Sequence, residues 1–280
     1  KNDINLSHLL VGSEGTLAYS AAIELKLSPL PAPKLMALCH FASFYAAMDA
    51  AQYLVPLDPI TVELIDQTMI SLARSIPLFK STVDDYIRND PEAVLVVEFA
   101  EEDWAKNLAK IDQLQSVMAQ LSDAQADKPR QKICTEEAVV VITPPDQQAR
   151  ISEMRKSGLN IMMSMKSEAK PVSFVEDCAV PLQDLAEYTQ GLTEIFEKYG
   201  TSGTWYAHAS VGCLHVRPVL NMKLSADVQK MKSIATEAFE LVQKYGGSHS
   251  GEHGDGLSRS EFNPMMFGPQ LTAAFSKLKA

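Results

Sequence analysis

The chain has 280 residues, of which 46% are hydrophobic and 21% are charged, and its net charge is −10. This composition can form a packed core of one large or two small domains, and the acidic balance argues against a nucleic-acid partner, because phosphate binding requires a basic face. No apolar run reaches the roughly 20 residues that span a bilayer, no signal peptide is recognisable, and four scattered cysteines without Cys-x-x-Cys spacing favour reduced thiols in the cytoplasm.

The first residues of the chain suggest that a longer protein surrounds it. The sequence opens at Lys1 without a methionine and reaches the turn Gly12-Ser13-Glu14-Gly15 soon afterwards. We interpret this start as the interior of a longer polypeptide. Backbone N–H groups of such a turn could contact a phosphate or the edge of a cofactor. An ordinary surface turn has the same composition, so the turn gains meaning only from its context.

Hydrophobic periodicity predicts alternating strands and helices along the chain. Strands are expected at 17–27, 35–41, 60–65, 94–99, 138–142, 172–174 and 205–210. Helices are expected at 42–54, 67–75, 102–121, 145–158, 181–199 and 225–245. The prolines at 29–33 indicate an extended linker, and the polar stretch 122–131 a surface loop between two similar halves. This pattern favours an α+β fold with a mainly antiparallel sheet and helices on one face.

Two glycine-rich segments contain three of the six histidines. His208 and His215 belong to His-Ala-Ser-Val-Gly-Cys-Leu-His after a predicted strand, and His253 belongs to Glu252-His253-Gly-Asp-Gly after a predicted helix. Two imidazoles and a carboxylate suit a divalent metal with open positions for substrate. Residues seven apart on one strand would face opposite sides, so Gly212 must form a turn that brings the histidines together. The alternative is two core histidines and a helix-capping glutamate.

Other residues could complete a site around this cluster. His253 is a candidate general base, since burial and a nearby cation can keep an imidazole neutral near pH 7; the alternative is a histidine in a surface turn. Arg155 and Lys170 flank a methionine-rich stretch and could bind a substrate carboxylate, arginine with bidentate geometry. From the residues alone, solvated surface charges explain both better.

Taken together, these segments resemble the C-terminal half of the FAD-linked oxidases of the vanillyl-alcohol-oxidase superfamily. The most similar branch contains D-lactate, glycolate and D-2-hydroxyglutarate dehydrogenases. Residues 11–18 are similar to the last flavin-contacting loop of the family's FAD domain, and 175–181 to the strand before its substrate-domain helix. Residues 208–215 stand in the place of the family's His-x-Gly-Asp-Gly-Asn-Leu-His, and Glu252-His253-Gly matches its Glu-His-Gly.

The resemblance implies a domain organisation and a reaction. Residues 1–30 would be the end of an FAD-binding domain with a linker, and 31–280 the substrate or cap domain with ferredoxin-like halves. The reaction would oxidise a D-2-hydroxy acid, such as D-lactate, glycolate or D-2-hydroxyglutarate, to the 2-oxo acid by hydride transfer to FAD. This chain alone is expected to be inactive. The implied site consists of metal ligands His208, His215 and Glu252 for zinc, iron or manganese; the base His253; substrate contacts Arg155, Lys170 and Arg217; and flavin contacts Gly12, Ser13, Glu14 and Gly15.

Departures from the family pattern keep other interpretations open. Val211 and Cys213 replace an aspartate and an asparagine, and lost polar support can lower metal affinity. Two possibilities therefore remain open: the site binds a different metal, or it binds no metal tightly. Two other classes of protein also remain open: a non-catalytic cap or assembly domain that has lost the site, and a zinc hydrolase with Glu252 as base. Metal content together with flavin reduction would separate these classes.

The resemblance also implies partners and a location. The variant is most similar to large fused proteins in which an FAD oxidase half precedes an iron–sulfur half. The expected partners are the small hydroxy acid, an N-terminal FAD-binding domain, and an iron–sulfur domain or another electron acceptor. The expected location is the cytoplasm, including the periphery of the inner membrane.

Overall fold

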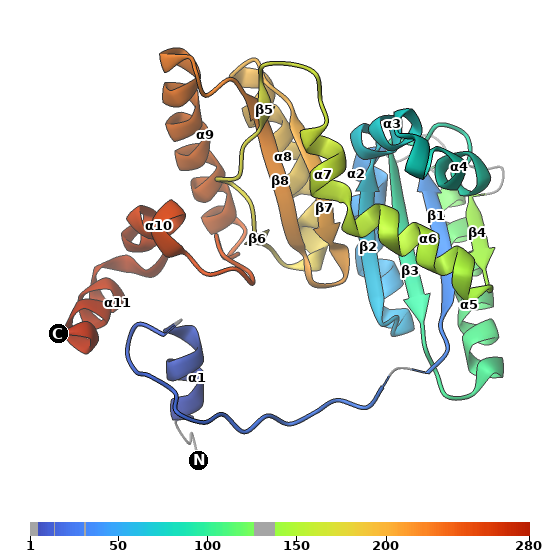
Figure 1. Ribbon diagram of the computed structural model, residues 1–280, viewed down its shortest axis with the longest axis horizontal. Coiled ribbons are helices and arrows are strands. Elements are labelled where there is room, and N and C mark those ends of the chain that lie inside the picture. Colours follow the sequence, from blue (N-terminus) through green and yellow to red (C-terminus); the bar gives the residue numbers. More distant parts are fainter. Residues whose placement is uncertain (1–4, 14, 31, 126–137) are drawn as a thin grey trace.

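The computed structural model describes residues 5–13, 15–30, 32–125 and 138–280 (Figure 1). Its strands form one eight-stranded sheet in the order β4-β1-β3-β2-β7-β8-β5, with β6 paired to β8. All strand pairs among the described residues are antiparallel. The strands are β1 (Leu35–Phe41), β2 (Thr61–Asp66), β3 (Ala93–Phe99), β4 (Val139–Ile142), β5 (Lys170–Pro171), β6 (Cys178–Ala179), β7 (Gly203–His208) and β8 (Cys213–Leu220).

Helices connect the strands and lie at both ends of the chain. They are α1 (Leu6–Gly12), α2 (Phe44–Leu54), α3 (Gln67–Ser75), α4 (Pro77–Tyr86), α5 (Trp104–Gln125), α6 (Pro145–Lys156), α7 (Gly158–Met163), α8 (Leu185–Lys198), α9 (Ser225–Lys244), α10 (Gly256–Arg259) and α11 (Asn263–Lys279). Across the described ranges, no helix is both long and apolar enough to cross a bilayer. The expected α+β class with a mainly antiparallel sheet is confirmed.

The sheet consists of two units of the same topology. In the first, β1-α2-β2 and β3-α5-β4 give the order β4-β1-β3-β2, which is the ferredoxin-like arrangement. In the second, β6-α8-β7 and β8-α9 repeat the pattern, and a single bridge between Ala179 and Ser248 stands in place of the fourth strand. The units join edge to edge through β2 and β7. The expected ferredoxin-like halves are confirmed.

Helices cover both faces of the sheet, and the expectation of one covered face was wrong. Alternate residues of β1 point into two separate cores. Leu35 and Ala37 belong to the core that includes residues of α2, α5, α8 and α9, whereas Met36 and Leu38 belong to the core that includes residues of α3, α4, α6 and α7. The two sets of helices lie on opposite faces of the sheet (Figure 1). The second layer arises because the connection from β2 to β3 contains two helices instead of a tight turn. β1 is therefore buried along its whole length.

Several predicted elements differ from the observed ones. Residues 17–27 form no strand, because this extended segment pairs with no other described strand. The expected loop 122–131 begins inside α5, and its residues 126–131 lie outside the described part of the chain. The predicted strand 172–174 is replaced by the short strands β5 and β6. The sequence pattern missed α1, α4, α7, α10 and α11, as well as β8, in which two polar residues and a proline interrupt the apolar run.

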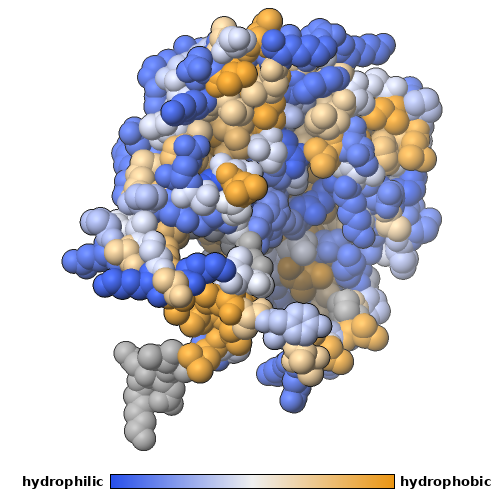
Figure 2. Space-filling model, turned by 60° about the vertical axis from the view of Figure 1, so that its left-hand side comes forward, coloured by the Kyte–Doolittle hydropathy of each residue, from blue (hydrophilic) through white to orange (hydrophobic). Residues whose placement is uncertain are grey.

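The N-terminal segment presents apolar side chains on its surface. No residue of α1 is buried, and Tyr19 and Leu30 are 92% and 94% exposed. Figure 2 shows hydrophobic residues gathered at the lower end of the molecule, and α1 lies at that end in Figure 1. The Lys279 ammonium, at the end of α11, donates to the carbonyl oxygen of Thr16. An apolar surface of this kind is typical of a contact with another protein surface.

Asp66 fixes the junction between the two units. One carboxylate oxygen accepts the N–H of Met69 at 2.7 Å and caps α3, and the other accepts the N–H of Trp205 at 3.0 Å. The residue is only 3% exposed, and this burial raises the pKa of Asp66 to about 6, although both hydrogen bonds act in the opposite direction. A side chain thus continues the link between β2 and β7 beyond their last paired residues.

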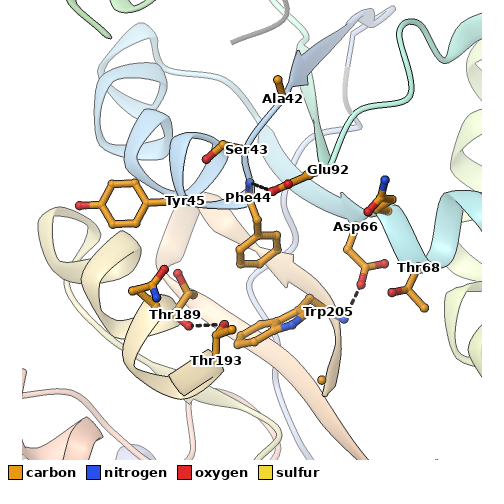
Figure 3. Close-up of a pocket in the computed structure, with 13 residues that line it drawn as sticks. Ala42, Ser43, Phe44, Tyr45, Asp66, Thr68, Glu92, Thr189, Thr193 and Trp205 are labelled. Atoms are coloured by element: carbon orange, nitrogen blue, oxygen red, sulfur yellow. Dashed lines mark hydrogen bonds between the residues drawn. The ribbon is translucent and has the colours of Figure 1, made fainter. Parts of the chain in front are cut away.

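A pocket of about 460 Å³ opens beside this junction (Figure 3). The rings of Phe44 and Trp205 lie 5.1 Å apart in its wall, and Thr189 and Thr193 of α8 lie opposite. Because successive residues of a strand face opposite sides, Trp205 and His208 of β7 lie on opposite faces of the sheet. The pocket is therefore separate from the histidine cluster.

Replacing Asp66 with asparagine should change how stability depends on pH. The folded-state pKa of about 6 exceeds the unfolded value of about 3.9, so the stability that protonated Asp66 contributes is complete below about pH 4 and is lost as pH rises through about 6. Relative to Asp66→Asn, the wild-type free energy of unfolding should fall by up to about 3 kcal/mol between pH 4 and pH 7. Urea unfolding of both proteins measures this; a difference that is constant with pH would contradict it.

Candidate functional site

Strand pairing places three candidate residues on one face of the sheet. His215 pairs with Tyr206 across β7 and β8, and His208 pairs with Glu63 across β7 and β2. Directly paired residues share a face, so Glu63, His208 and His215 project to the same side. The chain reverses through residues 209–212, where Gly212 has φ 67°. The expected turn is confirmed, and the rings of His208 and His215 lie 5.0 Å apart.

Glu252 completes a cluster of three imidazoles around one carboxylate oxygen. Its Oε1 lies 3.0 Å from Nε2 of His215, 3.3 Å from Nε2 of His253 and 3.4 Å from Nε2 of His208. The donor atoms of His208, His215 and Glu252 are close enough to one another to hold a metal ion. The His215 side chain is 3% exposed and that of Glu252 is 43% exposed, so the cluster has a buried floor and an open side.

Carboxylates stand behind both candidate histidine ligands. Glu63 approaches Nδ1 of His208 at 2.9 Å, and Glu176 lies 3.6 Å from Nδ1 of His215. The hydrogen bond from Glu63 raises the pKa of His208. A carboxylate at Nδ1 favours the tautomer whose Nε2 lone pair is free, which is the usual arrangement behind a metal-bound histidine. The residues present therefore fit a divalent metal.

Three rings form a stack through the centre of the site. Tyr206 and His215 lie 4.7 Å apart with an interplanar angle of 29°, and His215 and His253 lie 5.1 Å apart at 22°. His215 is buried in the middle, whereas the His253 side chain is 48% exposed. Stacking thus orients His253 while its ring stays accessible, which suits a proton acceptor.

Arg155 and Arg217 both lie beside the cluster, each paired with a carboxylate. The Arg155 guanidinium, at the end of α6, donates to Glu63 and lies 3.1 Å from Nδ1 of His208. Arg217 donates to Glu176 through Nε at 2.9 Å and Nη2 at 2.5 Å. Its Nη1 has no partner among the described residues. One edge of Arg217 is therefore committed to the protein, and one nitrogen is left for a further acceptor.

The other predicted site residues lie apart from the cluster. Lys170 pairs with Leu220 at the far end of β8, and its ammonium donates to the carbonyl oxygen of Met165. Gly12 ends α1, Ser13 donates to the carbonyl oxygen of Leu10, Gly15 has φ 77°, and Glu14 lies outside the described residues. In the described part of the chain, no hydrogen bond or ion pair joins Lys170 or this turn to the histidines.

Sequence reasoning missed the acidic residues that support the cluster. Glu176 and Asp177 are 5% and 0% exposed. Burial opposes the ionisation of Asp177, but the N–H groups of His253 and Glu252 and the Ser250 hydroxyl lower its pKa. Two adjacent acids within the apolar stretch 172–180 were the available signal. The sequence signal for Glu63 was weaker, because an acidic residue is common on the exposed face of a half-buried strand.

The two substituted positions differ in their surroundings. Val211 is 66% exposed at the turn between β7 and β8. Cys213 is 4% exposed, and its sulfur lies 3.5 Å from Oδ1 of Asp177. Burial raises the pKa of the Cys213 thiol, so it remains a neutral group beside the cluster. The polar support is therefore supplied by Glu63, Glu176 and Asp177.

Comparison with known proteins gives consistent matches over almost the whole chain. The family described as "FAD linked oxidases, C-terminal domain" matches residues 30–280. The chain is 32% identical to a D-2-hydroxyglutarate dehydrogenase of Escherichia coli (strain K12), over 99% of this chain and 27% of that protein. It is 26% identical to the glycolate oxidase subunit GlcD of Bacillus subtilis, over 99% of this chain and 54% of that protein. The chain thus spans about a quarter to a half of these relatives.

Solved structures share the fold. A 4-ethylphenol oxidase from Gulosibacter chungangensis superposes with a TM-score of 0.61 and 10% identity, over 91% of this chain and 52% of that chain. An alkyldihydroxyacetonephosphate synthase superposes with a TM-score of 0.54 and 15% identity, over 100% of this chain and 48% of that chain. At sequence identities this low, the similarity between the chain and these structures is one of fold.

Adding a methyl group at Gly212 should destabilise the fold strongly. A Cβ there would lie 2.1 Å from the carbonyl oxygen of Val180, in addition to the strain of φ 67°. Gly246 is the matched control, since it also has positive φ but an added Cβ would meet nothing within 4 Å. Gly246→Ala should cost about 1–2 kcal/mol, and Gly212→Ala about 1–3 kcal/mol more. Urea unfolding compares them, and equal losses would contradict the clash.

Replacing Glu63 with glutamine should weaken metal binding by about 10–100-fold, because a supporting carboxylate behind His208 is lost. Calorimetric titration with Zn²⁺ against a competing chelator measures the affinity. Glu98→Gln is the control, since Glu98 is also a buried acid of the sheet but pairs with Lys34 at 2.9 Å. An affinity equal in both variants would refute the role of Glu63.

Proposed function

Because the chain belongs to the family of FAD linked oxidases, C-terminal domain, we propose that it forms the substrate side of a flavin-dependent oxidoreductase. The reaction converts a D-2-hydroxy acid, such as D-lactate, glycolate or D-2-hydroxyglutarate, into the 2-oxo acid. The observation that carries the proposal is the convergence of three imidazole Nε2 atoms on Oε1 of Glu252. This arrangement offers both a metal-binding set and a proton acceptor within one small volume.

The chain's own residues divide the work of binding. His208, His215 and Glu252 would hold a divalent metal (zinc, iron or manganese). When bound, this ion supplies a Lewis acid that polarises the substrate hydroxyl. Glu63 keeps Nε2 of His208 directed at the site through its hydrogen bond with Nδ1. Glu176 lies 3.6 Å from Nδ1 of His215 and adds a negative charge behind that ring.

His253 accepts the hydroxyl proton at Nε2. Its ring is held by the stack on His215, and its exposed side faces incoming substrate. FAD supplies a two-electron acceptor for the reaction. The substrate loses its α-hydrogen as hydride and its hydroxyl proton to His253, so the C–O single bond becomes a carbonyl. Orientation of the substrate by this chain provides the proximity that such a transfer needs.

Arginines would recognise the carboxylate of the acid. Arg155 lies beside His208, and Nη1 of Arg217 has no partner among the described residues. Both suit a carboxylate within reach of the cluster. Lys170 lies at the far end of β8, so in this proposal it acts on a longer substrate or after a movement of the 165–170 segment.

The flavin and the electron acceptor belong to other parts of the assembly. Residues 1–30 would complete an N-terminal FAD-binding domain, and 31–280 would be the cap. Gly12 and Gly15 have open space beside their Cα atoms, which leaves room at these two glycines for a cofactor held by that domain. The flavin contacts would be Gly12, Ser13, Glu14 and Gly15. An iron–sulfur domain or another acceptor would receive the electrons, in the cytoplasm or at the periphery of the inner membrane.

Reduction of the flavin by paired D- and L-2-hydroxy acids tests this function. In the longer protein that contains this chain and an FAD domain, anaerobic addition of the D-isomer should bleach the flavin, and His253→Ala should slow bleaching by about 10²–10⁴-fold. Metal content is measured in the same samples. Bound metal without flavin reduction would favour a hydrolase with Glu252 as base. The absence of both bound metal and flavin reduction would favour an inert cap.

A further inference from the structure

A buried carboxylate lies directly beneath the segment that carries Glu252 and His253. Asp177 is 0% exposed, and its Oδ1 accepts the N–H of Glu252 at 2.8 Å while its Oδ2 accepts the N–H of His253 at 2.8 Å. Two successive peptide groups therefore point at the two oxygens of one side chain. Successive N–H groups that share an anion fix the local backbone conformation.

The backbone of Asp177 makes a second set of contacts with the same segment. Its N–H donates to the carbonyl oxygen of Leu214 at 2.8 Å, and its own carbonyl oxygen accepts the N–H of Gly251 at 2.6 Å. Asp177 adopts φ 78°, a left-handed conformation that few residues other than glycine tolerate. Leu214 precedes His215 in β8, so one residue connects the strand of a candidate ligand to the loop of another.

The loop has little rigidity of its own at this point. Glu252 and His253 are flanked by Gly251 and Gly254, the second with φ 77°. Glycine has the largest conformational freedom of any residue. The position of the two side chains must therefore come from contacts outside the loop, and the carboxylate of Asp177 accepts the N–H of both peptide groups.

Further contacts hold Asp177 itself in place. The Ser250 hydroxyl donates to Oδ2 at 2.8 Å, and the Arg259 guanidinium lies 3.4 Å from the same oxygen. With the Cys213 sulfur 3.5 Å from Oδ1, both oxygens are occupied by protein donors. Such an anion is stable when buried because every acceptor is satisfied.

We propose that Asp177 is a positioning residue that sets the placement of Glu252 and His253 through their backbone N–H groups. The proposal rests on the proposed function for what those two side chains do, a ligand carboxylate and a proton acceptor. Displacement of about 1 Å is enough to impair such a constellation. Asp177 acts on both groups at once through its hydrogen bonds to their backbone N–H groups.

Amide hydrogen exchange followed by NMR tests the contacts directly. In the wild-type chain the amides of Glu252 and His253 should be protected although both side chains lie at the surface. In Asp177→Asn they should exchange at least about 10-fold faster, because an amide side chain has only one acceptor oxygen for two N–H groups, while the β1 amides stay unchanged. Exchange of these two amides at the unstructured rate in the wild type would overturn the proposal without any variant.

Metal binding distinguishes a positioning role from a general structural role, because a residue that only stabilised the fold would not change the geometry of the metal site. Asp177→Asn should lower Zn²⁺ affinity about 10–100-fold and alter the visible spectrum of bound Co²⁺. The control is Asp227→Asn, since Asp227 also accepts a backbone N–H, from Asn221 at 2.8 Å, but on α9. An unchanged Zn²⁺ affinity and Co²⁺ spectrum in Asp177→Asn would overturn the proposal. A wild-type chain that takes up no Zn²⁺ would instead remove the metal from the proposed function, and amide exchange would still decide the role of Asp177.

Discussion

The pairing of β2 with β7 is the contact on which the rest of the site depends. Each ferredoxin-like unit contributes its second strand to this seam, and only the three residue pairs from Glu63 with His208 to Ile65 with Tyr206 form it. The seam places the acid of one unit behind the histidine of the other, and the next strand pairing adds His215. Beyond these pairs Asp66 continues the link through its side chain. Neither unit alone contains the complete arrangement.

Charge around the cluster is arranged in matched pairs. Glu63 contacts Arg155, Glu176 contacts Arg217, and Asp177 contacts Arg259. A buried carboxylate without a partner is costly, and a well-bonded pair removes most of that cost without adding much net stability. These pairs contribute geometry more than stability. Glu252 has no arginine partner among the described residues, so its negative charge is the one left for a cation.

Local sequence pattern predicted much of the fold because most elements here follow it. The strand Leu35–Phe41 is a nearly continuous apolar run, and the helix Phe44–Leu54 is amphipathic, so the signal for each lies within a few residues. β8 was missed because it buries His215 and Arg217, so polar residues occupy positions that are apolar in an ordinary buried strand. The segment 17–27 was overpredicted because alternation alone does not supply a partner strand. The histidines were recognisable from residue type and spacing, whereas Glu63 and Asp177 act through partners 145 and about 75 positions away, which no local window contains.

The reduced fourth strand of the second unit has a consequence for how this fold can change. In the first unit β4 closes the sheet with four residues, but in the second a single bridge at Ser248 is all that remains. The residues that follow Ser248 are the ones that bend back to present Glu252 and His253. The backbone after Ser248 can therefore either pair with the edge of the sheet or bend toward the histidine cluster, but it cannot do both. Extending this strand beyond Ser248 would make the edge of the sheet more regular, but it would remove the bend that brings Glu252 and His253 to the histidine cluster.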